Sequence, residues 1–394
     1  MVVRILRGIV ILFLVAAAAF FILAPGIVER ALNPITMPEG GWPVSDKAKS
    51  LHQRLVIGDW HSDALLWDRN LRNRASRGHT DLPRLQQGNV AVQVFTTVTK
   101  SPRGLNDRTN STEAADNITL MFMGQLRPVR SWFSLRERAL VQAHELRDLA
   151  GKAPDSLRLI LTRDDLAAVL QARAGGAQVL GAILGAEGGH ALEGDLANLD
   201  VLYDAGFRLM GLTHFFDNEL GGSLHGAGDG RGLTDFGRQV VARMMDKGMV
   251  IDLAHASPQM VRDVLAIQGT RPILSHTGIH GHCAVHRNLD DDLMRQIAAK
   301  GGVIGIGFWS HFVCGKTPDD IAASVLAAIA LVGADHVSLG SDYDGSVDVP
   351  FDTAHLAALT QALMDAGLSE PVIAKVMGGN MMRYLSETLP AEGA

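Results

Sequence analysis

Eight apolar segments typical of buried β-strands recur along the chain, with helical segments between them. Residues 234–248, 257–269 and 290–302 space their apolar positions with the helical period. Strands that alternate with helices pair in parallel, and near-continuous apolar runs indicate burial on both faces. The predicted strands lie within residues 54–61, 90–99, 179–187, 208–215, 248–255, 271–276, 301–308 and 336–342.

Eight strand–helix units close most naturally into a (β/α)₈ barrel, and the 394 residues exceed the roughly 250 that such a barrel uses. An open, doubly wound sheet is the alternative. No glycine-rich fingerprint follows the first strand, which weakens a dinucleotide-binding version of that sheet. The pattern therefore predicts an α/β fold, a TIM barrel.

The N-terminal segment, residues 1–28, differs from the rest of the chain. Arg4 and Arg7 precede an uncharged run at 8–28, which is about the length that crosses a hydrocarbon core of roughly 30 Å. We interpret it as an uncleaved membrane anchor that exports the following domain to the periplasmic or extracellular side. A cleaved signal peptide and a secreted domain are the alternative. Residues 29–44, which contain Pro and Gly without a period, are predicted to be a linker to one domain at 45–394.

Charge and cysteine content exclude some classes of protein. A formal net charge of −6 provides no basic field for nucleic acid, so we expect no such partner. Two cysteines, Cys283 and Cys314, are too few for a disulfide scaffold and lack the CxxC spacing of a thiolate zinc site. They either pair in an oxidising compartment or pack as small apolar residues, and we favour the core interpretation.

Six of the eight predicted strands end in an imidazole or a carboxylate. Each such residue alone could be a structural histidine, a helix cap or a turn residue. Ionisable groups directly after buried runs are costly to bury, however, and barrel enzymes gather their chemistry at the C-terminal ends of the strands. The candidates are His61 and Asp63 after the first strand, Glu187 at the third, His214, His255 and His276 at the fourth to sixth, and Asp342 with Asp344 at the eighth.

A shared metal explains this combination of side chains. Imidazole and carboxylate ligands suit Zn²⁺, although Mn²⁺ or Co²⁺ would also be tolerated. At least five candidate ligands exceed the three that one catalytic zinc needs, so two ions bridged by a carboxylate are predicted. Glu187 lies in chain order between the other ligands and is the natural bridge, while His61 and Asp63 hold one ion of the pair.

Several motifs also carry a family resemblance. From about residue 50 to 386 the chain resembles the membrane dipeptidase (renal dipeptidase) family of zinc hydrolases. The motifs follow the family's order; they are HSD at 61–63, HTDLPRLQQGNVAVQVF at 79–95, GAEGGHAL at 185–192, LTH at 212–214, GLTDFGRQVVARMMDKGMVIDLAHAS at 232–257, PILSHTGIHGHCAVHRNLDDD at 272–292, SLGSDYDG at 338–345 and GGNMMRYL at 378–385.

The resemblance implies a barrel of the metal-dependent hydrolase type with two Zn²⁺ per chain, bridged by Glu187 and a hydroxide. It assigns His61 and Asp63 to one zinc, and His255 and His276 to the other. It also implies that His214 faces the substrate carbonyl oxygen, that Arg287 binds the substrate's terminal carboxylate and that Asp342 transfers the proton.

The implied activity is hydrolysis of dipeptides with a free C-terminal carboxylate, including C-terminal D-residues, and the family suggests a homodimer. Hydrolysis of N-acyl amino acids or lactams on the same metal site is the alternative. A non-catalytic barrel is disfavoured because every proposed ligand is present.

Polar residues near these motifs receive less specific interpretations. The glycine-rich loop 215–232 departs from the form found in well-known dipeptidases and is expected to shape the substrate pocket. We interpret His225 and Asp229 as flexible-loop residues without a catalytic role. His190 is a candidate partner for orienting a metal ligand, and Asp81 reads as a helix cap.

Overall fold

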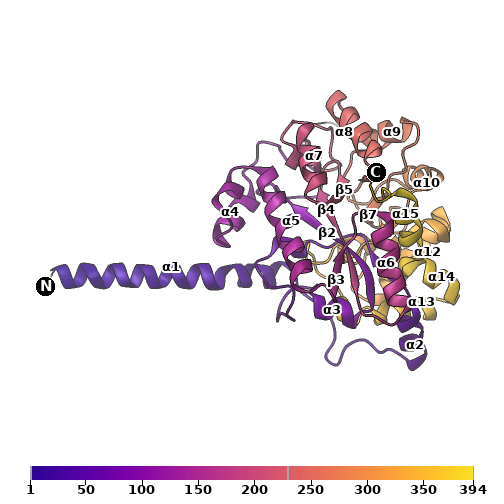
Figure 1. The fold of residues 1–394 in the computed structure, drawn as a ribbon, viewed down its shortest axis with the longest axis horizontal. Coiled ribbons are helices and arrows are strands. Elements are labelled where there is room, and N and C mark those ends of the chain that lie inside the picture. Colours follow the sequence, from indigo (N-terminus) through magenta and orange to yellow (C-terminus); the bar gives the residue numbers. More distant parts are fainter. Residues whose placement is uncertain (1, 229, 394) are drawn as a thin grey trace.

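In the residues that the computed structural model describes, 2–228 and 230–393, eight parallel strands form a closed barrel with helices around it (Figure 1). Neighbouring strands follow the order β6-β5-β4-β2-β1-β9-β8-β7. A parallel bridge between Asp252 and Ile273, with Leu253 N donating to Ile273 O at 2.8 Å, joins β6 to β7 and closes the ring. The predicted TIM barrel is confirmed; its strands are β1 (Ile57–Asp59), β2 (Val90–Val98), β4 (Leu180–Glu187), β5 (Phe207–Gly211), β6 (Val250–Asp252), β7 (Leu274–Thr277), β8 (Ile304–Ile306) and β9 (Val337–Leu339).

A further strand, β3 (Leu157–Leu159), was not predicted from the sequence. It pairs in parallel with the first residues of β4 and lies outside the ring of eight. Only Leu157 in it is buried, and Arg158 is exposed. A three-residue strand with a charged centre lacks the apolar run that identifies the barrel strands.

Helices surround the barrel and bury its outer face. The segments predicted to be helical at 234–248, 257–269 and 290–302 form α8, α9 and α10, and the side chains of Thr234, Ser257 and Asp290 cap their N-termini. Besides α1 and α4, described below, the helices are α2 (Asp46–Arg54), α3 (Leu82–Gln87), α5 (Leu135–Lys152), α6 (Arg163–Ala174), α7 (Ala197–Asp204), α8 (Asp235–Asp246), α9 (Pro258–Ala266), α10 (Asp291–Ala299), α11 (Ser310–Val313), α12 (Pro318–Val332), α13 (Ala357–Asp365), α14 (Glu370–Ala374) and α15 (Asn380–Thr388).

The C-terminal helix α15 closes the end of the barrel where the strands begin. Its Met381 and Tyr384 are fully buried, and Tyr384 packs edge-on against Trp60. A Cβ atom on Gly58 would lie 2.6 Å from Met381 Sδ, so the close approach of α15 to β1 requires glycine there. This end of the barrel is therefore filled by apolar side chains.

Helix α1 (Val2–Leu32) projects away from the barrel (Figure 1). It is long and apolar enough to cross a membrane by length and composition, and the barrel does not bury its apolar window. Its last turn differs, because Glu29 is buried against Arg69 and Arg77. The helix thus continues four residues into the segment 29–44. Helix α4 (Asn117–Gly124) lies beside α1.

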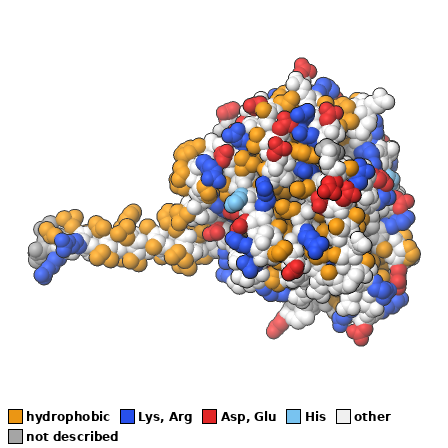
Figure 2. All heavy atoms as spheres, viewed as in Figure 1, with side chains coloured by type: hydrophobic (Ala, Val, Ile, Leu, Met, Phe, Trp, Pro, Cys, Tyr) orange, Lys and Arg blue, Asp and Glu red, His pale blue; other side chains and the backbone are white. Residues whose placement is uncertain are grey.

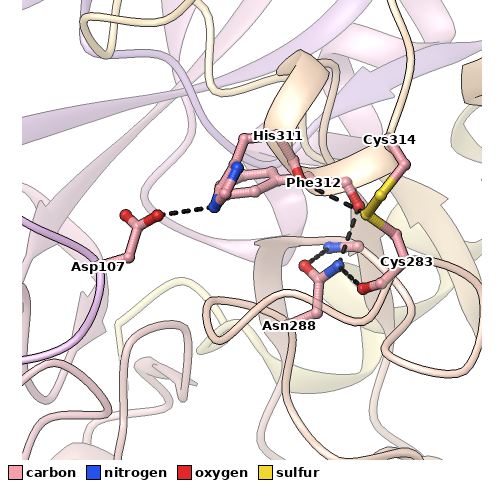
Figure 3. The surroundings of a disulfide bond; sticks show 7 residues. Asp107, Cys283, Asn288, His311, Phe312 and Cys314 are labelled. Carbon is pink, nitrogen blue, oxygen red and sulfur yellow. Dashed lines mark hydrogen bonds and ion pairs between the residues drawn. A yellow bond between two sulfur atoms is a disulfide. The ribbon is translucent and has the colours of Figure 1, made fainter.

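The two cysteines form a disulfide, so the core interpretation favoured from the sequence is wrong. Cys283 and Cys314 have Cα atoms 5.7 Å apart and join the loop after β7 to the loop after β8 (Figure 3). Asn288 strengthens this connection by donating to the carbonyl oxygens of Cys283 and Phe312, both at 2.9 Å. The residues are 31 positions apart, and only the adjacency of β7 and β8 in the barrel brings them together.

Candidate active site

Imidazole and carboxylate side chains converge at the end of the barrel where the strands finish. They come from six different strands or the residues that follow them, and each is buried. The cluster consists of His61 and Asp63 after β1, Glu187 at the end of β4, His214 after β5, His255 after β6, His276 in β7 and Asp342 after β9.

Glu187 lies at the centre of this cluster. Its Oε1 is 3.4 Å from His61 Nε2, 3.3 Å from His255 Nε2 and 3.6 Å from His276 Nε2. Its Oε2 is 3.4 Å from His214 Nε2. One carboxylate therefore contacts imidazoles on both sides of the barrel mouth.

The two aspartates lie on the His61 side. His61 Nε2 is 3.5 Å from Asp63 Oδ1 and 3.9 Å from Asp342 Oδ1. Thr96 on β2 donates its hydroxyl to Asp63 Oδ1 at 2.5 Å and so fixes that carboxylate. His255 and Asp342 have φ values of 65° and 61°, in a left-handed region that residues other than glycine seldom adopt and that occurs at functional sites.

The donor atoms of the cluster fit a divalent metal. Three overlapping groups have donor atoms within 4.8 Å of one another, and each contains both imidazole and carboxylate. This donor set suits Zn²⁺ and similar cations. The groups are His61, Asp63 and Glu187; Glu187, His214 and His255; and His61, His276 and Asp342.

Burial and mutual charge shift the pKa values of these residues in different directions. Burial lowers the pKa of His214, His255 and His276 well below the usual value, which leaves neutral nitrogen donors. Burial also opposes protonation of His61, but the charges of Glu187 and Asp63 outweigh it and raise that pKa.

The carboxylates respond in the opposite sense. Burial raises the pKa of Asp342 well above its usual value, and the charges of Glu187 and Asp63 add to this increase, while His61 works against it. Burial and the charge of Asp63 likewise raise the pKa of Glu187. The cluster thus holds more negative charge than its surroundings stabilise, which is the condition under which a cation binds.

Arg287 supplies a positive charge beside the cluster. It is buried, its Nη2 lies 3.1 Å from His255 Nε2, and it donates to the carbonyl oxygen of His276. Its guanidinium carbon is 4.9 Å from the centre of the Phe312 ring, and its Nε has no hydrogen-bond partner among the described residues. Arg287 therefore retains donor capacity for a ligand.

A cavity of about 120 Å³ opens above these groups. Asp63, Glu187, His214, His255, Arg287 and Asp342 line it, and the other lining residues are mostly apolar. The apolar lining residues are Leu66, Val98, Leu105, Ile118, Phe215, Trp309, Phe312 and Val347. The cavity combines a charged floor with walls that suit small apolar side chains.

Two buried aspartates that the sequence analysis did not single out support the cluster. Asp252 at the end of β6 accepts hydrogen bonds from Ser275 N and Oγ, and Ser275 Oγ lies 2.8 Å from His276 Nδ1. Asp59 at the end of β1 similarly accepts from Ser341 N and Oγ. A charged residue inside an otherwise apolar strand is the sequence signal that could have identified both.

Other predicted polar residues lie around the cluster rather than in it. Asp81 caps α3, as predicted, by accepting from Arg84 N. His225 is fully buried with its ring centre 5.4 Å from that of His255, so it is not a flexible-loop residue. His190 stacks on Phe216, and neither ring nitrogen has a hydrogen-bond partner in the described part of the chain.

Asp344 and Asp229 complete the set. Asp344 accepts from the backbone of His79 and Thr80 and pairs with Arg69, which makes it a structural residue of the loop that carries Asp342. Asp229 lies outside the described residues.

A closed parallel barrel with imidazole and carboxylate groups at its mouth defines the class of metal-dependent barrel hydrolases. The sequence model of the membrane dipeptidase family, peptidase family M19, matches residues 45–392, and the chain belongs to this family. Membership places it among the metal-dependent dipeptidases.

Individual relatives agree with this assignment. An uncharacterized dipeptidase of Schizosaccharomyces pombe is 28% identical over 324 residues, covering 79% of this chain and 72% of that protein. Dipeptidase aclJ of Aspergillus oryzae is 26% identical over 359 residues, covering 85% and 78%. A metallopeptidase of Rhodobacter sphaeroides, solved with a phosphinate mimic of the dipeptide L-Ala-D-Ala, shares the fold with a TM-score of 0.68 and 24% identity, covering 85% and 99%.

Proposed function

We propose that the protein hydrolyses dipeptides that have a free C-terminal carboxylate, with two zinc ions bound by His61, Asp63, Glu187, His255 and His276. The observation that carries this proposal is the position of Glu187, whose two oxygens lie within 3.3–3.6 Å of four imidazole nitrogens. A carboxylate in that position can be shared between two ions. Two divalent cations held there would acidify water and polarise the amide carbonyl.

The remaining buried groups have separate roles in this proposal. His214, which burial keeps neutral, can donate an N–H to the oxygen of the scissile carbonyl as negative charge develops on it. Asp342 can accept a proton from the attacking water and return it to the leaving amine, a role that a raised pKa favours near neutral pH. Both side chains line the same cavity.

Arg287 is the proposed binding group for the substrate's C-terminal carboxylate. A guanidinium is planar and can bind a carboxylate through two parallel hydrogen bonds, which a lysine cannot do. Because the Rhodobacter sphaeroides metallopeptidase was solved with a mimic of L-Ala-D-Ala, we extend the proposal to dipeptides with a C-terminal D-residue. The apolar walls of the small cavity favour short side chains.

We further propose that α1 anchors the protein in a membrane and that the barrel domain is exported. The Cys283–Cys314 disulfide supports this location, because such bonds form and persist in oxidising compartments. Cleavage of residues 1–28 would give a secreted form instead. The division into a segment at 1–28, a linker at 29–44 and a domain at 45–394, and the homodimer, stay predictions.

Metal content and substrate range test the catalytic proposal. The full chain in detergent is analysed for metal and assayed on a dipeptide panel that includes L-X-D-Y members, before and after chelation. We expect about two zinc ions per chain and cleavage that chelation abolishes. Cleavage of N-acyl amino acids or lactams without cleavage of dipeptides would favour the alternative activity, and absence of metal would overturn the mechanism.

An Arg287→Lys variant tests the carboxylate contact. We expect kcat/KM for a dipeptide to fall on the order of 10²-fold, because the planar fork is lost, and kcat/KM for the matching dipeptide amide to change little. Arg271→Lys is the matched control, since Arg271 pairs with Glu387 at the surface. Equal losses for the acid and the amide would show that Arg287 does not bind the carboxylate.

A further inference from the structure

We propose that the apolar surface formed by Leu120, Leu126, Val129 and Phe133, called here the α4 surface, inserts into the bilayer that α1 crosses. The occupant of this surface is lipid in the leaflet on the side of the barrel domain. The inference rests on the proposed membrane anchoring by α1, and it does not depend on which substrate the enzyme cleaves.

The α4 surface exposes large apolar side chains over a short stretch of chain. Phe133 is 79% exposed, Leu126 65%, and Leu120 and Val129 each 59%. Helix α4 itself, residues 117–124, contains no charged residue. Isolated apolar residues are normal on soluble surfaces, but a group of this kind marks an interaction site. Figure 2 shows hydrophobic side chains continuing from α1 onto the adjoining part of the domain.

The position of α4 beside α1 identifies lipid as the occupant. A cavity of about 360 Å³ lies between the two helices, lined by Phe20, Ala24 and Val28 of α1 and by Leu120 and Met121 of α4. The three α1 residues belong to the uncharged run at 8–28. With a rise of 1.5 Å per residue, they span about 12 Å of depth. Wherever this part of α1 lies in hydrocarbon, α4 lies alongside it, and acyl chains can fill the cavity.

Buried polar contacts fix the direction in which α1 leaves the barrel. The Glu29 carboxylate, 1% exposed, lies 2.6 Å from Arg69 Nε and also pairs with Arg77. One residue beyond α1, Asn33 accepts a hydrogen bond from Ser346 N at 2.9 Å. Breaking a buried ion pair is strongly unfavourable, so α1 cannot swing freely away from α4. Insertion of α1 therefore brings the α4 surface to the bilayer.

The same contacts place the active-site mouth next to the membrane. Ser346, which contacts Asn33 directly after α1, lines the active-site cavity, and so does Ile118, a buried residue of α4. Helix α4 thus separates the cavity from the proposed lipid-facing surface. The bilayer lies beside the opening through which a substrate enters, rather than at the opposite end of the barrel.

Fluorescence quenching in vesicles tests the proposal with the full chain. Single cysteines replace Leu120 or Phe133, are labelled with an environment-sensitive fluorophore, and are studied in phosphatidylcholine–phosphatidylglycerol vesicles. Val15→Cys in α1 is the internal standard for insertion. Ser386→Cys is the matched control, because Ser386 is exposed on α15, on the part of the domain away from α1 (Figure 1). All four positions are exposed, and the native cysteines are paired.

We expect lipid-attached nitroxides to quench the labels at 120 and 133 several-fold more than the label at 386, and aqueous iodide to show the reverse order. Quenching at 15 with responses at 120 and 133 like that at 386 would overturn the α4 surface while leaving the anchor intact. No lipid quenching at 15 would overturn both. Protection from iodide without lipid quenching would mean that protein, such as a second copy of the chain, covers the surface. Dipeptidase activity of the same samples reports separately on the proposed function.

Discussion

The two ends of the barrel are built from the same eight strands but bury opposite kinds of side chain. Where the strands begin, Val250 at the start of β6 belongs to one apolar cluster with Met381 and Tyr384 of α15, which closes this end. Where they finish, the carboxylate oxygens of Glu187 lie 3.3–3.6 Å from the Nε2 atoms of four histidines. The comparison shows that the barrel carries stability at one end and, on six of its eight strands, the groups of the proposed chemistry at the other, a division that this fold permits.

The energetic consequences of the two ends also differ. A fully buried apolar side chain contributes about 1.5–3 kcal/mol to stability through removal from water. A buried carboxylate without its partner opposes folding instead. Substitutions at the closed end should therefore change the free energy of unfolding, and substitutions at the mouth should change the rate of hydrolysis.

The largest effect is expected from Glu187→Gln, which keeps the shape of the side chain and removes its charge. Loss of the proposed shared ligand should lower kcat/KM on the order of 10³-fold, equivalent to about 4 kcal/mol of transition-state stabilisation. The metal-free variant should unfold at the same or a higher urea concentration than the metal-free parent, because burial raises the pKa of Glu187 and opposes its charged form.

Glu193→Gln is the matched control for that experiment. Glu193 is exposed and accepts hydrogen bonds from Ser134 Oγ and Leu135 N, outside the catalytic cluster. Its kcat/KM should stay close to that of the parent. A kcat/KM of Glu187→Gln within tenfold of the parental value would show that Glu187 is not the shared metal ligand of the proposed mechanism.

At the closed end, Met381→Ala should mainly lower stability. Met381 is fully buried against Gly58, and large-to-small substitutions of this type cost about 2–5 kcal/mol. Urea unfolding should show that loss, while kcat of the folded protein stays near the parental value. Met381→Leu, which conserves volume, should cost less than about 1.5 kcal/mol. A tenfold fall in kcat without a change in stability would contradict the separation of the two ends.

Sequence periodicity predicted the barrel and most residues of the candidate site, because the pattern that identifies a strand and its last residues lies within one short segment. Six of the eight predicted strands are apolar runs that end in, or are directly followed by, an imidazole or a carboxylate, so the strands and the residues at the mouth follow from the same segments. Strand β3 was not predicted, because it is three residues long and has Arg158 at its centre. The disulfide and the burial of His225 depend on which loops meet in three dimensions. A local sequence pattern does not predict such contacts between distant segments.

Asp252→Asn should produce an intermediate effect at the mouth. The substitution removes the charge that accepts from Ser275 Oγ at 2.6 Å, and that hydroxyl in turn contacts His276. Loss of such a supporting contact typically lowers metal affinity or activity by about 10–100-fold. Metal titration and kcat/KM measure both effects. Ser275→Ala should behave similarly, and the double variant should lose little more than either single one, since both act through His276. Fully additive losses would mean that the two residues act independently.

The smallest predicted effect concerns a histidine buried at the closed end of the barrel, which can be compared with the histidines buried at the mouth. His52 on α2 lies 2.8 Å from Thr360 Oγ1 through Nδ1 and 3.1 Å from Gly88 O through Nε2. Burial lowers its pKa from 6.5 to about 4, although the Gly88 carbonyl works against the change. Between pH 6.5 and about pH 4, His52 is protonated in the unfolded chain but stays neutral in the folded protein. The stability that the neutral imidazole provides is therefore complete above pH 6.5 and is lost as the pH falls toward 4.

Replacement of this imidazole should flatten the acid dependence of stability without affecting catalysis. In His52→Gln, the fall in unfolding free energy between pH 7 and pH 5.5 should be smaller by about 1 kcal/mol, because one titrating group is gone. Urea unfolding of the metal-free protein at the two pH values measures it. Thr360→Val keeps the imidazole and removes its partner, so it should lower stability at both pH values while retaining the parental slope. An unchanged slope in His52→Gln would assign the acid sensitivity to the histidines at the mouth, and the closed end would then contribute to stability through apolar packing alone.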